Sequence, residues 1–138
     1  AKEGMDSETV VIARPSRAAP LKIDLPLHLT GVFAPAPEDW SEIDANQCWL
    51  DADAVEWPLT VRPWKNGDAI APRGMNGSQK VSDLLTQSKV PSHSRSGFYV
   101  MQSADGILLW VVGLRTSRHA EIGTKTASPW CLTLHPPT

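Results

Sequence analysis

Basic side chains set among turn residues are the groups in this sequence best suited to bind a ligand. Residues 58–83 contain two clear turn signals, Gly67-Asp68 and Asn76-Gly77. Glycine takes positive φ without steric cost, and Asn or Asp bonds its own backbone. A turn-rich edge of this kind would display cations rigidly, in position to contact phosphate groups. The basic residues of the stretch are Arg62, Lys65, Arg73 and Lys80.

The other basic residues of interest fall into two groups. Lys89 and Arg95 follow the turn-rich stretch, and Arg115 and Arg118 follow the most apolar run of the chain. Two interpretations stay open at this point: a surface that contacts a phosphate backbone, or an ordinary solubilising surface. The loop at 74–77 is equally open, because backbone amides ahead of a helix form either an anion-binding nest or a plain turn.

The sequence shows no pattern for catalysis or metal binding. It has no G-x-x-x-x-G-K-S/T loop, no G-x-G-x-x-G after a strand and no G-x-S-x-G elbow. The four histidines are scattered singly, and Cys48 and Cys131 lack a zinc-ligand spacing. We therefore predict no catalytic and no metal-binding residue in this chain, and we interpret both cysteines as buried thiols. Most of the six tryptophans are predicted to be core residues, with Trp64 the most exposed.

Length and charge narrow the class of protein. A chain of 138 residues fits one domain. Its net charge of −2 argues against a globally basic nucleic-acid protein, so such binding must come from local clustering. No apolar run approaches the ~18 residues of a membrane span, and no signal peptide is visible, so we expect a cytoplasmic protein without membrane contact. Because position 1 is not methionine, we expect a fragment of a longer chain.

The elements that would position the basic residues are mostly short strands. Apolar or alternating runs predict strands at 10–13, 21–29, 32–34, 48–50, 59–62, 98–101, 107–114 and 130–134. Pro26 demotes its strand to an edge or a bulge, and Gly31 is expected to end it. The run at 107–114 is apolar throughout, which is typical of a central strand covered on both faces.

Two local patterns concern the basic residues directly. Alternation over 59–62 places Leu59 and Val61 inside and Arg62 on the solvent face. A serine N-cap followed by apolar residues at helical spacing predicts a helix over 78–88. One helix among about eight strands predicts a β-rich α+β fold, a sandwich or barrel with a helix packed on it.

Several motifs occur together and in a specific order across residues 48–118. They are Leu-Asp-Ala-Asp-Ala-Val at 50–55, Pro-Leu-Thr-Val-Arg-Pro-Trp at 58–64, Gly67-Asp68, Pro72-x-Gly74-Met75-x-Gly77, Lys80-Val81-Ser82-Asp83 and Leu109-Trp110-Val111-Val112-Gly113-Leu114-Arg115. In this order they resemble the C-terminal domain of bacterial tRNA(Ile)-lysidine synthetase, the TilS or MesJ family. We expect residues 1–138 to be one domain, with lead-in strands and a loop at 1–47, the motif region at 48–118, and a terminal strand and tail at 119–138.

The resemblance implies a non-catalytic module of an ATP-dependent ligase that modifies tRNA. In the family, an N-terminal domain with a Ser-Gly-Gly-x-Asp-Ser loop binds ATP, adenylates cytidine 34 of tRNA(Ile) and attaches lysine. That loop does not occur in this sequence. The resemblance therefore implies no catalytic residue and no cofactor in this fragment, with ATP and magnesium in the parent enzyme. The implied fold is the β-sandwich of unusual topology also seen in the β-subunit of phenylalanyl-tRNA synthetase, with one main packed helix near 78–88.

The implied partners are tRNA(Ile), on its acceptor-stem side, and the catalytic domain of the same enzyme, and a homodimer stays open. Carried over by position, the resemblance makes these residues candidates for RNA contact, the first four foremost: Arg62, Lys65, Lys80, Arg115, Arg73, Lys89, Arg95 and Arg118. The chain departs from the family at Ala69-Ile70, where Arg-Phe is common, and at 116–119. The alternative is a structural docking or dimerisation module whose basic residues are solvated.

Overall fold

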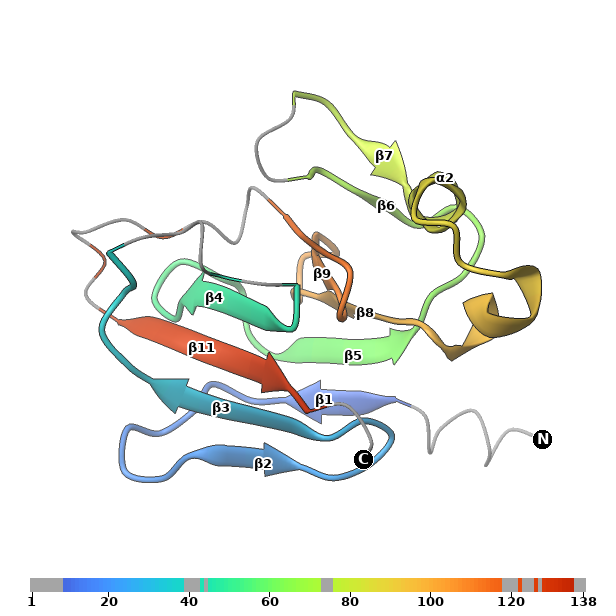
Figure 1. Cartoon of the computed structure of the whole chain (residues 1–138). Helices are drawn as coiled ribbons and strands as arrows, with labels where there is room; N and C mark the ends of the chain where they lie inside the picture. The colour runs from blue at the N-terminus through green and yellow to red at the C-terminus, as the bar shows by residue number, and fades with distance from the viewer. Residues whose placement is uncertain are drawn as a thin grey trace.

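Two antiparallel sheets pack face to face, and a helix covers the outer face of one of them (Figure 1). The structure is a computed structural model that describes residues 9–38, 43, 45–72, 76–117, 122, 126 and 128–135. The first sheet has the strand order β1-β5-β8-β9-β10, and the second has the order β2-β3-β11-β4. A separate two-stranded ladder pairs β6 with β7.

The element bounds show how the sheets draw on distant parts of the chain. The first sheet contains β1 (Val10–Ile12), β5 (Leu59–Pro63), β8 (Tyr99–Gln102), β9 (Leu108–Val111) and β10 (Arg115–Thr116). The second contains β2 (Leu21–Ile23), β3 (Leu29–Phe33), β11 (Pro129–Leu134) and β4 (Gln47–Asp51). The remaining elements are β6 (Ala69–Ile70), β7 (Gln79–Lys80), α2 (Val81–Gln87) and the 3-10 helix η2 (Ser92–Gly97).

The main hydrophobic core lies between the two sheets. Alternation on β5 turns Leu59 and Val61 into this core, as predicted. From the opposite sheet, Trp130 on β11 meets Trp57 edge-on, with 5.5 Å between the ring centroids. This layer of apolar side chains holds the sandwich together, because neither sheet could bury its apolar face alone.

A second core lies on the other face of the first sheet. Helix α2 buries Val81, Leu84 and Leu85, which recur at the i, i+3, i+4 spacing of an amphipathic helix. They pack against the sheet at Val100 and Val111. The helix and the β6–β7 ladder therefore form a unit that sits on the sandwich, which we call the α2 unit (residues 64–72 and 76–90).

Strand β9 confirms the prediction of a central strand covered on both faces. All four of its residues are buried, with Leu109 and Trp110 in the main core and Leu108 and Val111 in the second. The strand is shorter than the apolar run, because residues 112–114 turn the chain back into β10, with Gly113 at φ 80°.

Two sequence predictions of element bounds were wrong. Residues 21–33 form a β2–β3 hairpin rather than one strand, with a cis Leu25–Pro26 peptide in the connection. Gly31 does not end a strand but lies in the middle of β3, opposite Leu132. The helix begins at Val81 rather than Ser78, because Gln79 and Lys80 pair with β6 instead. The predicted fold class, a β-rich sandwich with one main packed helix, is confirmed.

Candidate nucleic-acid interface

Arg62 is held between the sheet and the α2 unit. It lies opposite Val100 in the β5–β8 ladder and therefore faces the second core. Its guanidinium forms a two-point ion pair with Asp68, with Nη1–Oδ2 and Nη2–Oδ1 distances of 3.0 Å each. Its Nε and Nη2 also donate to Gln102 Oε1, at 2.9 and 2.7 Å. The predicted solvent-face position is wrong, because the α2 unit covers this face and leaves 17% of the side chain exposed.

All N–H donors of the Arg62 guanidinium have partners inside the protein. A guanidinium carries five such donors. Four bonds go to Asp68 and Gln102, and Nη1 also donates to the Pro63 carbonyl at 3.1 Å. A phosphate group would have to displace one of these partners. Phosphate contact by Arg62 stays a prediction, and its geometry favours a structural role.

Asp68 connects the turn after β5 to the start of α2. Its Oδ2 accepts a hydrogen bond from the Lys65 backbone N–H at 2.9 Å, and its own N–H donates to the Lys65 carbonyl at 3.1 Å. Its carbonyl accepts the N–H of Val81, the first helical residue, at 2.9 Å. This bond satisfies one of the amides that a helix N-terminus leaves unpaired.

The charge of Asp68 is stabilised although the residue is buried. Burial by itself would raise the carboxyl pKa, but hydrogen bonds from Arg62 and from the Lys65 backbone oppose this effect. With the positive charges of Arg62 and Lys65, they lower the pKa of Asp68 below its ordinary value. The pair with Arg62 is therefore ionic at neutral pH.

Lys65 and Lys80 are both exposed, and both are tied by backbone bonds to Asp68. Lys65 exchanges backbone bonds with Asp68 directly. Lys80 lies opposite Ala69 in the β6–β7 ladder and immediately precedes Val81. The main-chain positions of the two lysines are thus defined by one buried residue, while their side chains reach solvent.

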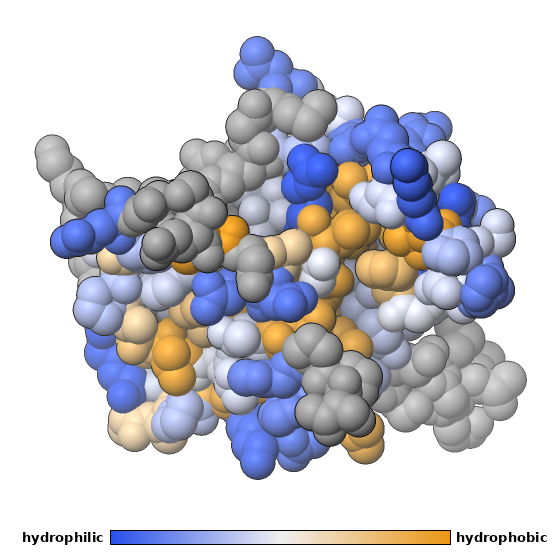
Figure 2. Space-filling model, viewed as in Figure 1, coloured by the Kyte–Doolittle hydropathy of each residue, from blue (hydrophilic) through white to orange (hydrophobic). Residues whose placement is uncertain are grey.

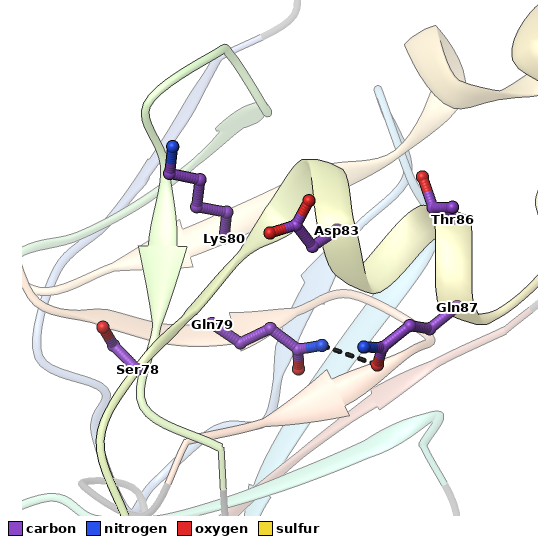
Figure 3. A pocket seen from close by; sticks show the side chains of 6 residues that line it. All are labelled: Ser78, Gln79, Lys80, Asp83, Thr86 and Gln87. Atoms are coloured by element: carbon purple, nitrogen blue, oxygen red, sulfur yellow. Dashed lines mark hydrogen bonds between the residues drawn. The ribbon is translucent and has the colours of Figure 1, made fainter.

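An open groove of about 500 Å³ runs along β7 and α2 (Figure 3). Its lining is polar throughout and consists of Ser78, Gln79, Lys80, Asp83, Thr86 and Gln87. The amides of Gln79 and Gln87 meet across the groove, with Gln79 Nε2 donating to Gln87 Oε1 at 2.7 Å. Hydrophilic residues also gather over this part of the surface in Figure 2. Such a lining fits a hydrated polar ligand better than an apolar one.

Lys89 follows the C-terminus of α2 in a left-handed conformation, with φ 59°. Its N–H donates to the Thr86 carbonyl and the Val90 N–H donates to the Leu85 carbonyl, both at 3.0 Å. This is the Schellman arrangement, whose left-handed position is usually glycine. The exposed Lys89 side chain thus adds a third cation to the α2 unit at a position that disfavours any side chain.

Arg95 is less available than the three lysines. Its Nε donates to the Val90 carbonyl at 3.1 Å, and the residue is half-buried. Its carbonyl accepts a hydrogen bond from Trp64 Nε1 at 2.6 Å. The half-buried Trp64 ring packs against the second core, so this tryptophan is a structural residue.

The remaining predicted cations lie towards the β10 edge of the first sheet. Arg115 is half-buried on β10, opposite Val111. An isolated bridge joins Ser117 to Pro72, so β10 and the segment after β6 lie side by side. Arg73, Arg118 and residues 74–75 of the predicted nest lie outside the described residues.

Other chemistry was sought in the described part of the chain. There, no group of three or more His, Cys, Asp or Glu side chains could hold a metal ion, and no helix is long and apolar enough to cross a bilayer. Cys48 and Cys131 are buried free thiols, as predicted. Burial raises the pKa of both, and the proximity of Cys131 raises that of Cys48 further. The folded protein therefore keeps both thiols protonated.

Sequence reasoning missed three glutamines of this region. Gln102 is 40 residues from Arg62, and only the β5–β8 ladder brings the two together. Gln79 and Gln87 meet because β7 leads directly into α2. No local motif marks an uncharged side chain of this kind. Asp68 did belong to a recognised signal, but that signal was interpreted as a turn.

The fold and this surface define a class of protein: a β-rich α+β domain whose helical unit displays lysines beside a polar groove. Comparison with known proteins identifies the family. The model of a family described as the TilS substrate C-terminal domain matches residues 59–130. The match covers more than half of the chain, and the chain belongs to this family, which confirms the resemblance seen in the motifs.

Individual relatives and structures agree with this assignment. The chain is 35% identical over 90 residues to the tRNA(Ile)-lysidine synthase of Geobacter sulfurreducens, a match covering 65% of this chain and 19% of the relative. It is 38% identical over 97 residues to that of Bacillus licheniformis, covering 70% and 19%. The chain thus spans about a fifth of the length of these relatives.

Solved structures show the same fold. A crystal structure of a TilS C-terminal domain superposes with a TM-score of 0.74 at 23% identity, covering 91% of this chain and 95% of that one. An N-terminal fragment of the phenylalanyl-tRNA synthetase β-subunit from Pyrococcus horikoshii superposes with a TM-score of 0.52 at 14% identity, covering 64% and 27%. The predicted kinship of the two folds is confirmed.

Proposed function

We propose that this chain is the non-catalytic, tRNA-binding C-terminal module of a tRNA(Ile)-lysidine synthetase. Family membership and the relatives named tRNA(Ile)-lysidine synthase support the proposal. In this proposal the chain is one domain of a longer cytoplasmic enzyme. The ligase chemistry, with its ATP and magnesium, belongs to a catalytic domain outside the chain, and this module holds the acceptor-stem side of tRNA(Ile).

The observation that carries the proposal is the set of exposed cations on the α2 unit. Lys65, Lys80 and Lys89 all reach solvent on this unit, and Lys80 borders the polar groove. Each lysine can neutralise one phosphate and release its counterions. Double-stranded RNA is recognised mainly through its phosphates and 2′-hydroxyl groups. A groove with amide and hydroxyl side chains offers donors and acceptors for those hydroxyls.

The test measures tRNA(Ile) affinity of the intact synthetase as a function of salt concentration. Replacement of Lys65, Lys80 and Lys89 by alanine should weaken binding. It should also lower the slope of log affinity against log salt by about 2.7, or about 0.9 for each phosphate released. Lys22→Ala is the matched control, since Lys22 is an exposed lysine on β2, in the other sheet. It should leave affinity and slope unchanged.

A second comparison locates the contact on the RNA. An isolated anticodon stem-loop should bind the triple variant as well as it binds the unaltered enzyme, because it lacks the acceptor stem. Equal binding of full-length tRNA(Ile) by both enzymes would contradict the proposal. If the triple variant also retained its association with the catalytic domain or a second copy, the docking or dimerisation alternative would be favoured.

A further inference from the structure

We propose that Arg62 and Asp68 form a positioning pair that holds Lys65 and Lys80 for RNA contact without touching RNA itself. This inference rests on the proposed function, because it concerns how the same surface is built. It assigns to Arg62 a different role from the one its basic character suggests. It also assigns a role to Asp68, an anion beside a surface that should bind an anion.

The first argument is connectivity. Asp68 is 8% exposed and accepts both the Arg62 guanidinium and the Lys65 backbone N–H with its carboxylate. Its carbonyl accepts the N–H of Val81, the residue after Lys80. The bonds that place the two lysines therefore converge on one side chain and its own peptide groups. A displacement of Asp68 would move both lysines.

The second argument is electrostatic. Arg62 and Asp68 neutralise each other at 3.0 Å in a largely buried site, so the pair adds little net field at the surface. The positive potential that RNA would meet comes from the exposed lysines. Because every guanidinium donor is already engaged, Arg62 could bind a phosphate only by abandoning Asp68 or Gln102.

The third argument is that the pair is anchored to the sandwich. Gln102 on β8 accepts from both Nε and Nη2 of Arg62, which fixes the plane of the guanidinium. Arg62 itself is on β5, in the centre of the first sheet. The pair thus links a rigid strand to the turn that carries Lys65 and to the strand that carries Lys80.

Asp68→Asn separates positioning from simple electrostatics, because the two predict opposite signs. Removing a negative charge beside an anion-binding surface should by itself strengthen tRNA binding. If Asp68 positions the lysines, the variant should instead bind tRNA(Ile) more weakly, by about tenfold, the size expected for the loss of one charge-assisted hydrogen bond. The salt slope should also fall, by up to about 1.8 if both lysine contacts are lost.

Two further variants keep the test independent of the folding of Asp68→Asn. Arg62→Lys retains the charge, and lysine is a good phosphate binder, so a directly contacting Arg62 should tolerate the change. A positioning Arg62 should not, because lysine cannot reproduce the two-point pair. Gln102→Ala changes no charge and should weaken binding in the same direction, through loss of its two bonds to Arg62.

Affinity must be measured in the intact synthetase at a temperature where each variant is folded, with folding followed by thermal denaturation. Cys48→Ala serves as a destabilised control, because Cys48 is buried in the main core, away from the α2 unit. It should lower the melting temperature without changing tRNA affinity. If Asp68→Asn behaves like this control, or binds more tightly than the unaltered enzyme, the pair does not position the lysines.

The outcomes distinguish this inference from the proposed function. If Lys65→Ala and Lys80→Ala leave tRNA binding unchanged, the RNA-contact role of these lysines fails. If they weaken binding while Arg62→Lys, Asp68→Asn and Gln102→Ala do not, only the positioning role fails. Weakened binding in both sets, with smaller salt slopes in both, supports the two together.

Discussion

Gly31 on β3 lies against the indole of Trp130 on β11, so closely that a Cβ atom at position 31 would come within 2.5 Å of Trp130 Cζ2. The same atom would lie 2.9 Å from Cε2 and 3.2 Å from a methyl carbon of Leu132. The Trp130 ring is almost completely buried in the main core. The absence of a side chain at Gly31 is therefore what allows β3 and β11 to pair across this ring.

Gly31→Ala should destabilise the fold by about 1–3 kcal/mol, the range for overpacking a dense core. The large, rigid indole cannot move aside as the end of a flexible side chain would. Chemical denaturation measures the change in the free energy of unfolding. Gly97→Ala is the control, because no heavy atom lies within 4 Å of its Cβ position. That variant should fall within about 0.5 kcal/mol of the unaltered protein, and an equal loss in both would contradict the steric explanation.

The Asp68 carboxylate should make stability depend on pH in the acid range. Its pKa in the folded protein is lowered, so its stabilising effect is present above the unfolded-state pKa of about 3.9 and is lost as pH falls through the folded value. Denaturation of the unaltered protein and of Asp68→Asn between neutral and acid pH measures the effect. The stability difference should be constant near neutrality and shrink below about pH 4. A difference independent of pH would show that the carboxylate charge is not responsible.

Lys89 should show opposite effects on stability and on RNA binding. Lys89→Gly should raise the free energy of unfolding by about 0.5–1 kcal/mol, because glycine adopts the left-handed conformation without steric cost. The same change removes a proposed phosphate contact and should weaken tRNA binding. Lys89→Ala is the matched variant, since it loses the charge but keeps a Cβ atom. It should bind as weakly as Lys89→Gly without the gain in stability, and unchanged tRNA binding in both would remove Lys89 from the interface.

Asp83 should act against RNA binding. It is exposed in the first turn of α2 and lines the same groove as Lys80. Asp83→Asn should strengthen tRNA binding by removing a repulsive charge, and the gain should shrink at high salt as screening increases. It should also lower stability by about 0.3–1 kcal/mol, because an acidic residue stabilises a helix N-terminus. Filter binding at two salt concentrations tests this, and weaker binding by Asp83→Asn would place the RNA elsewhere.

Local pattern was sufficient for much of the fold. Period-2 alternation located β5 and turned Leu59 and Val61 inwards, and an uninterrupted apolar run marked β9 as a strand buried on both faces. The spacing of apolar residues predicted α2, although three residues too early. These features follow from backbone periodicity and from the need to bury apolar surface, both of which operate over a few neighbouring residues.

Long-range pairing decided what local pattern could not. The strand containing Gly31 was mistaken for two fragments, because its reason for being glycine is a tryptophan about a hundred residues later. Likewise β6 and β7 are two residues each, too short for any periodicity, and exist because they pair with each other.

The sequence by itself determined the family, the sandwich class and the set of cations from which an RNA contact surface would be drawn, because motif order and residue type are carried by the chain directly. Only the tertiary structure decided what each cation does. Lys65 and Lys80 reach solvent, whereas Arg62, on the same short stretch, is enclosed by Asp68 and Gln102. The physical reason is that an arginine between two packed layers must find partners for all its donors within the protein. Those partners come from a turn and from a strand 40 residues away, and only folding brings them together.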